Sequence, residues 1–238
     1  MLGNKFHIHI DVDATFDVHN ALLYEYFEIF LMKELGFSLK NFSGVPADSH
    51  RHAPERHLTH KTQDSRAFYR IFDSIESYLT QHPKAMTGYI EGEYIPERIQ
   101  IPDSEFNPNV AVPFKLELGS LPTGKFREDE IHITLDRDNS DPRLISSLRQ
   151  MGFFSVYMDK DYGTAEIFTT QGYYHDIQTV LPLITNYLNQ VGGAVNCVIK
   201  EERIVRSWMS APDITLPPVI TSIQQLAVAQ PTHQLCVR

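Results

Sequence analysis

The sequence predicts an α+β fold built from two tandem ferredoxin-like units, each with the element order β-α-β-β-α-β. Three observations predict it. Short segments of the first half recur in the same order in the second half, apolar residues alternate along some segments, and apolar residues recur every three or four positions along others. The length of 238 residues suits two units of about 100 residues each.

The internal repeat consists of short colinear matches. The segment HIHIDVD at 7–13 matches HITLDRD at 132–138 at four of seven positions. Further along the chain, LGF at 35–37 matches MGF at 151–153, and Ile90 matches Ile199. One short match is expected by chance, whereas a series in the same order indicates a duplication.

In the first unit, Phe6, Ile8 and Ile10 alternate with polar residues, which is the period of a half-buried strand. Asp17 is a plausible N-cap for the helix that follows, and Gly36 stands where that helix should end. The remaining elements are expected as strands over about 37–43 and 57–63, a helix over 66–81 and a strand over 86–95.

The second unit repeats this order with shorter connections. Its first strand is expected over 129–136, and Asp141-Pro142 combines an N-cap with proline at the first helical position. Strands over about 153–159 and 164–170 follow, then a helix over 175–190 that ends at Gly192-Gly193, and a last strand over 194–204.

These elements predict antiparallel sheets of strand order 4-1-3-2 with both helices on one face. The open faces need a cover, and the simplest cover is the other unit. We therefore expect the two sheets to pack open face to open face, as in a dimeric α+β barrel made within one chain. The expected organisation is a first unit at 1–97, a linker rich in Pro and Gly at 98–127, a second unit at 128–206 and an extended tail at 207–238, anchored by Trp208 and the segment 216–220.

Net charge, apolar runs and cysteine spacing limit the classes of partner and the cellular location that we expect. The formal net charge of −9 argues against nucleic acid as a partner. No apolar run reaches the roughly 18 residues that would span a bilayer, so no membrane partner is expected. The two cysteines form neither a metal spacing nor a disulfide framework, which predicts a reducing, cytoplasmic location.

A metal site is the first functional hypothesis. His7 and His9 are two positions apart on a strand, so both imidazoles project from one face. Glu91 and Glu93 are expected on the same face of the neighbouring strand, and either would complete a set of two histidines and one carboxylate for a divalent ion of the Fe or Zn class. His57 is the alternative third ligand, and His132 is expected to face this site from the second unit.

A phosphoesterase is the second hypothesis. His57-Leu58-Thr59 and His132-Ile133-Thr134 are both His-x-Thr tripeptides, and they resemble the paired motifs of the 2H phosphoesterases. The resemblance implies that one histidine acts as general base and the other as general acid on a phosphodiester, with the threonine hydroxyls holding the phosphate. His57, His132 and Thr134 are therefore candidate catalytic residues, and Asp11 is a further candidate because it shares the open face of the first strand with His7 and His9.

The third hypothesis is a non-catalytic binding or scaffold module. The chain lacks the patterns of a nucleophile elbow, a phosphate-binding loop and a dinucleotide site. The sequence thus predicts a small-molecule ligand between the two units and leaves open whether the protein is an enzyme.

Overall fold

The computed structural model describes residues 5–12, 18–40, 42–44, 56–116, 129–161, 163–172 and 174–209. The first half contains β1 (Phe6–Val12), α1 (Val18–Ile29), the π-helical turn η1 (Phe30–Glu34), β2 (Ser38–Lys40), β3 (Phe42–Gly44), β4 (Arg56–Thr62), α2 (Ser65–Gln81) and β5 (Gly88–Gln100). The second half contains β6 (Asp129–Asp136), α3 (Pro142–Gln150), β7 (Phe154–Lys160), β8 (Gly163–Gly172), α4 (Tyr174–Val191) and β9 (Val198–Met209).

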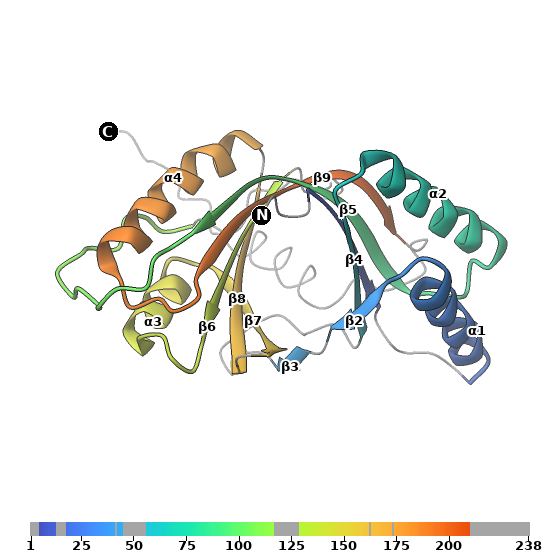
Figure 1. Ribbon diagram of the computed structural model, residues 1–238, viewed down its shortest axis with the longest axis horizontal. Coiled ribbons are helices and arrows are strands. Elements are labelled where there is room, and N and C mark those ends of the chain that lie inside the picture. Colours follow the sequence, from blue (N-terminus) through green and yellow to red (C-terminus); the bar gives the residue numbers. More distant parts are fainter. Residues whose placement is uncertain are drawn as a thin grey trace, which may run out of the picture.

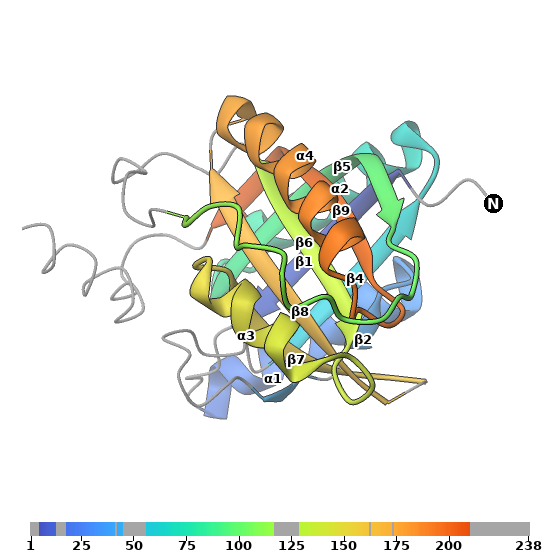
Figure 2. The same ribbon diagram turned by 90° about the vertical axis from the view of Figure 1, so that its left-hand side faces the viewer.

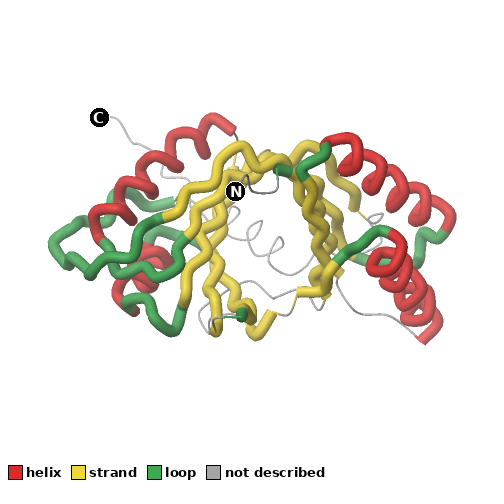
Figure 3. Tube along the Cα trace, viewed as in Figure 1, coloured by secondary structure: helices red, strands yellow, loops and turns green. Residues whose placement is uncertain are grey.

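The described strands form one nine-stranded antiparallel sheet of order β2-β4-β1-β5-β9-β6-β8-β7-β3. The sheet curves into a nearly closed barrel, and the helices lie outside it (Figures 1 and 3). Helices α1 and α2 cover the strands of the first half, while α3 and α4 cover those of the second (Figures 1 and 2). The protein is therefore α+β with a barrel-like sheet.

The two halves share one sheet, which differs from the expected pair of separate sheets. Strand β5 pairs with β9 from Tyr89 opposite Met209 to Gln100 opposite Val198. Each of these strands is the edge of its own half, and an unpaired edge exposes a row of backbone donors and acceptors. Pairing the two edges satisfies these groups and turns the open faces of both halves towards the barrel interior.

The segment expected as one strand over 37–43 is two short strands with different partners. β2 pairs with β4 in the first half, whereas β3 pairs with β7 in the second half. Because β2 and β3 are the two ends of the sheet and nearly adjacent in sequence, this segment brings the barrel close to closure.

Two strands extend beyond their predicted ends. β5 continues to Gln100, into the expected linker, and β9 continues to Met209, into the expected tail. Trp208 consequently belongs to a strand, where it packs against the core of the first half. The predicted N-cap Asp17 and the anchor segment 216–220 lie outside the described residues.

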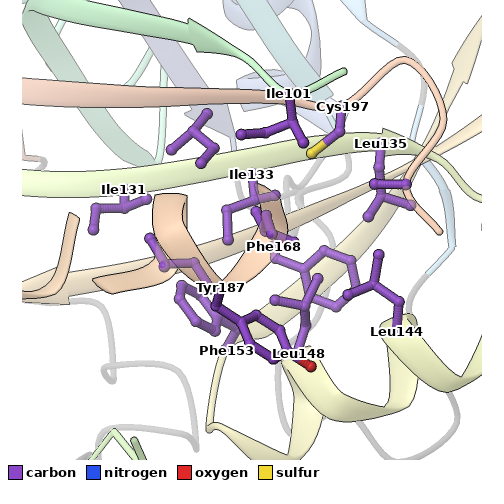
Figure 4. Close-up of a cluster of buried hydrophobic side chains, with 14 of the residues drawn as sticks. Ile101, Ile131, Ile133, Leu135, Leu144, Leu148, Phe153, Phe168, Tyr187 and Cys197 are labelled. Carbon is purple, nitrogen blue, oxygen red and sulfur yellow. The ribbon is translucent and has the colours of Figure 1, made fainter. Parts of the chain in front are cut away.

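Each half has its own hydrophobic core between its helices and the outer face of the sheet. In the first half, Ile8, Ile10 and Ile90 of the sheet pack with Phe68 and Phe72 of α2. In the second half, β6, β8 and the helices contribute a matching cluster, which includes Ile131, Ile133, Leu135, Leu144, Leu148, Phe168 and Tyr187 (Figure 4). Since alternate strand residues fill these cores, the residues between them face the barrel interior. None of the described helices combines the length and apolar character needed to cross a bilayer.

A buried carboxyl at the start of β6 predicts a pH-dependent stability. Burial and the adjacent Glu201 raise the pKa of Asp129 to about 7. The folded protein therefore holds a proton that the unfolded chain releases, and stability falls as the pH rises from about 4 to about 7. We expect Asp129→Asn, which cannot ionise, to stabilise the protein by roughly 1–3 kcal/mol at pH 8 and to flatten this decline. Urea unfolding at pH 5 and pH 8 measures both effects, with Asp161→Asn at an exposed position as control.

Candidate metal centre

The inner face of β1 places three polar side chains inside the barrel. Ile8 and Ile10 enter the core, so His7, His9 and Asp11 point the other way. In the sheet register, His7 lies opposite Glu93 of β5, and Asp11 lies opposite His57 of β4. Leu58 of β4 is buried in the core, so its neighbour His57 faces inwards, and His60 turns outwards to the Gly36 carbonyl.

Four of the inward-facing side chains form a compact group. One ligand atom from each of His7, His9, Glu93 and Glu202 lies within 4.8 Å of the others. His9 Nε2 is 2.8 Å from Glu93 Oε2, and His7 Nδ1 is 3.5 Å from the same oxygen and 3.8 Å from Glu202 Oε1. All four side chains are buried, with Glu93 1% and Glu202 0% exposed. Two imidazoles and two carboxylates are a donor set that suits Fe(II) and Zn(II).

Several polar atoms of this group have no hydrogen-bond partner. They are Nδ1 and Nε2 of His7, Nε2 of His9, Oε2 of Glu93 and both carboxylate oxygens of Glu202. Some of these atoms nevertheless lie close to a side chain of opposite character, since Glu202 Oε2 is 2.8 Å from His132 Nδ1 and His9 Nε2 is 2.8 Å from Glu93 Oε2. A buried polar atom without a partner costs about 1–3 kcal/mol, so convergence of several at one point requires an explanation. A bound cation supplies an explanation, because it would engage one nitrogen of each imidazole and one oxygen of each carboxylate at a single point.

A chain of hydrogen bonds orients His9. His57 Nδ1 bonds the Asp11 carboxylate, and His57 Nε2 lies 3.2 Å from His9 Nδ1. The Asp11 carboxylate accepts, so His57 carries a proton on Nδ1, and a neutral His57 accepts at Nε2 from the His9 Nδ1–H. The lone pair of His9 then resides on Nε2, the atom that faces Glu93. This is the arrangement by which a carboxylate fixes the tautomer of a metal-binding histidine, here through a second imidazole.

His132 lies beside this group but is engaged differently. Its Nε2 is 2.8 Å from Glu130 Oε2, and its Nδ1 is 2.8 Å from Glu202 Oε2. Burial lowers its pKa, but Glu202 and Glu130 outweigh burial and raise it to about 10. His132 is thus an imidazolium between two carboxylates. Glu130, His132 and Glu202 also fulfil the distance criterion for a metal site, but both ring nitrogens of His132 already carry protons.

Burial sets the protonation of the four-residue group. It lowers the pKa of His7 to about 3 and that of His9 well below its ordinary value, so both imidazoles are neutral at pH 7. Burial and the charge of Glu202 raise the pKa of Glu93 well above its ordinary value. The neutral imidazoles can bind a metal without losing a proton, whereas Glu93, whose raised pKa favours the protonated form, would release its proton on coordination.

The structure brings some of the predicted site residues together and leaves others apart. His7, His9 and Glu93 belong to one group, with Asp11, His57 and His132 around it. Glu91 also faces inwards, opposite His9, but is not a member of the group. Thr134 lies opposite Ile167 and Val198 with no side-chain hydrogen bond among the described residues.

Two functional candidates, Glu130 and Glu202, were missed by the sequence argument. Both could have been found with the rules already used. Glu130 stands two positions before His132 on one strand, the same spacing as His7 and His9. Glu202 is the counterpart of Glu93 when Ile90 is aligned with Ile199.

The two His-x-Thr tripeptides bring their histidines into the same region of the barrel. The ring centroid of His9 is 5.0 Å from that of His57 and 6.4 Å from that of His132. Every ring nitrogen of His57 and His132 already faces a protein group. The general acid and base roles of a 2H phosphoesterase would each need a nitrogen directed at the substrate.

Comparison with known proteins adds little. No protein-family model matches the chain, and no curated protein matches it. Among solved structures, an anthrone oxidase-like protein matches with a TM-score of 0.28 and 8% identity, covering 90% of this chain and 97% of that one. A proposed monooxygenase from Lactobacillus acidophilus NCFM matches with a TM-score of 0.26 and 11% identity, covering 87% and 97%. These likenesses are too low to support any inference about function.

The hydrogen-bond chain behind His9 gives a direct prediction. Asp11→Asn leaves all four members of the group in place but offers His57 an amide in place of a carboxylate. We expect metal affinity to fall by about 10–100-fold, the usual effect of removing a partner of a ligand. Competition with a chromophoric chelator measures this. Asp138→Asn, on a turn outside the barrel, should bind metal like the wild type.

Proposed function

We propose that this protein is a metal-dependent enzyme that acts on a small molecule inside the barrel, with a divalent ion of the Fe or Zn class bound by His7, His9, Glu93 and Glu202. The observation that carries the proposal is the convergence of buried, unpartnered nitrogen and oxygen atoms from these four side chains. A purely structural polar cluster would be expected to satisfy its own hydrogen bonds.

The surrounding residues have distinct parts in this proposal. The ion, when bound, supplies Lewis acidity or redox chemistry towards a substrate or dioxygen. His57 and Asp11 hold His9 in the tautomer that leaves Nε2 free to coordinate. His132 holds a proton between Glu130 and Glu202, next to the ligand group, and its positive charge offsets the negative charge of these buried carboxylates.

Metal analysis tests the proposal. The protein is purified without chelators and its metal content is measured by plasma mass spectrometry. We expect about one equivalent of Fe or Zn per chain, and recovery of one equivalent when the stripped protein is reloaded with Fe(II) or Zn(II). Less than about a tenth of an equivalent in both measurements would favour the binding-module or phosphoesterase alternatives.

We also infer that the fold arose by tandem duplication of a ferredoxin-like unit, with units at 1–97 and 128–206. The strand order supports this when the short β3 is set aside, because β2-β4-β1-β5 and β7-β8-β6-β9 then both follow the order second, third, first and fourth strand of their half. The site supports it as well, since His7 and Glu93 of the first half have His132 and Glu202 as counterparts in the second. An ancestral symmetric dimer would have carried two equivalent His–Glu pairs facing each other.

A further inference from the structure

Four lysines project from four different strands towards the barrel interior. We call them the lysine cluster: Lys40, Lys61, Lys160 and Lys200. The register fixes three of them, since Lys61 lies opposite His7, Lys200 opposite His132 and Lys40 opposite His57. Partners across an antiparallel pair share a face, so these lysines point the same way as the histidines.

Lys160 joins the cluster from β7. It follows Met158 by two positions, which places both on one face of the strand. Met158 pairs with Phe42, whose ring lies 4.9 Å from that of His57. The lysine cluster therefore draws on both halves of the barrel, like the metal ligands beside it.

The lysine cluster is poorly neutralised. Lys200 Nζ lies 3.6 Å from Glu202 Oε1, but Lys40, Lys61 and Lys160 form no ion pair within the described part of the chain. Burial, then Lys200, Lys160 and Lys40, lower the pKa of Lys61 to about 8, with Glu202 acting in the opposite direction. Burial, Lys200 and Lys40 also lower the pKa of Lys160, against the opposing charge of Asp161. Like charges that face one interior from four strands repel one another, and such groupings concentrate at binding sites.

We infer that the lysine cluster binds an oxyanion group, a carboxylate or a phosphate, of a small organic substrate. Ammonium groups from several strands can each donate a charge-assisted hydrogen bond to one such group. Lys61 retains solvent-exposed surface, so an anion can reach it from solution. The inference names the substrate class for the proposed metal centre and rests on that function for the reaction, whereas anion binding itself needs no metal.

The position of the lysine cluster beside two proposed metal ligands indicates the role of the substrate's anionic group. Lys200 contacts Glu202, a proposed metal ligand, and Lys61 lies opposite His7, another one. An anionic group held here would anchor one end of the substrate and leave the rest beside the metal centre. Fixing a substrate by a group remote from the reacting atoms is a common source of orientation in catalysis.

Isothermal titration calorimetry with inorganic phosphate in one arm and benzoate in the other tests the inference. Both are run on the protein as purified and on the same protein stripped with chelator. We expect at least one anion to bind both forms, with Kd raised at least about tenfold in Lys61→Gln/Lys160→Gln. The arm with the lower Kd identifies the head group. Lys84→Gln, which removes a charge from an exposed turn, should leave Kd unchanged.

Thermal unfolding with and without anion shows whether a loss of anion binding in the variant comes from misfolding. Without anion, Lys61→Gln/Lys160→Gln should unfold at a higher temperature than the wild type, because repulsion is relieved, and phosphate or benzoate should stabilise only the wild type. Equal Kd values for wild type and double variant would overturn the inference. So would anion binding that disappears on metal removal, since the anion would then be a ligand of the ion alone. Lysine-dependent anion binding in a protein that takes up no metal would uphold the anion site and refute the metal centre.

Discussion

We expect His7→Ala/His9→Ala to lose metal binding, with affinity lowered at least about a thousandfold. The variant removes both imidazoles from a set of four ligands. The free energy of binding to a buried four-ligand zinc site is about 10–16 kcal/mol, so each ligand accounts for about 3 kcal/mol and every 1.4 kcal/mol is a factor of ten. Chelator competition and metal analysis of the purified variant measure the loss.

A matched variant separates this effect from unfolding. His60→Ala/His82→Ala also removes two imidazoles from the first half, one beside the Gly36 carbonyl and one at the end of α2. It should retain metal at the wild-type level. Wild-type metal content in His7→Ala/His9→Ala, with a folded circular dichroism spectrum, would refute the assignment of these two ligands.

The second large effect concerns the packing behind Glu93. Phe68 of α2 is fully buried and lies over Gly92, where an added Cβ would come within 2.7 Å of its Cζ atom. The absence of a side chain at Gly92 lets α2 approach β5 directly behind the strand that carries Glu93. We expect Phe68→Ala to lower the free energy of unfolding by about 3–5 kcal/mol, from lost burial and a cavity.

The neighbouring residue provides the control. Tyr69 is on the same helix and is 45% exposed, so Tyr69→Ala should cost less than about 1 kcal/mol. Urea unfolding of both variants gives the comparison. A Phe68→Ala cost as small as that of Tyr69→Ala would mean that the core of the first half does not depend on this ring.

Local patterns predicted the elements well. The helix from Ser65 to Gln81 and the helix that begins at Pro142 lie close to their expected positions, because spacing, caps and proline act within a few residues. The inward direction of His7 and His9 followed from simple alternation along β1. These features depend on neighbours in sequence, which the sequence displays directly.

Features that depend on distant partners were not predictable. No local signal shows that β5 and β9 pair, or that residues 38–44 divide between β4 and β7. The choice between Glu91 and Glu93 also depended on this pairing. Both carboxylates face inwards, but only Glu93 lies close to Glu202 of the second half. The two halves join along β5 and β9, which we call the seam, and the sequence did not predict this pairing.

The ligands of the proposed metal centre come from both sides of the β5–β9 pairing, so metal binding requires the two halves to stay joined along these strands. His7, His9 and Glu93 come from one side of the pairing, and Glu202 from the other. Each core reaches across this pairing, because Trp208 of β9 packs against the core of the first half and Ile101, which follows β5, is buried in the core of the second. Separation of β5 from β9 would break the ligand set, and a bound ion would hold the two strands together. We therefore expect the amide hydrogens of β5 and β9 to exchange more slowly when metal is added.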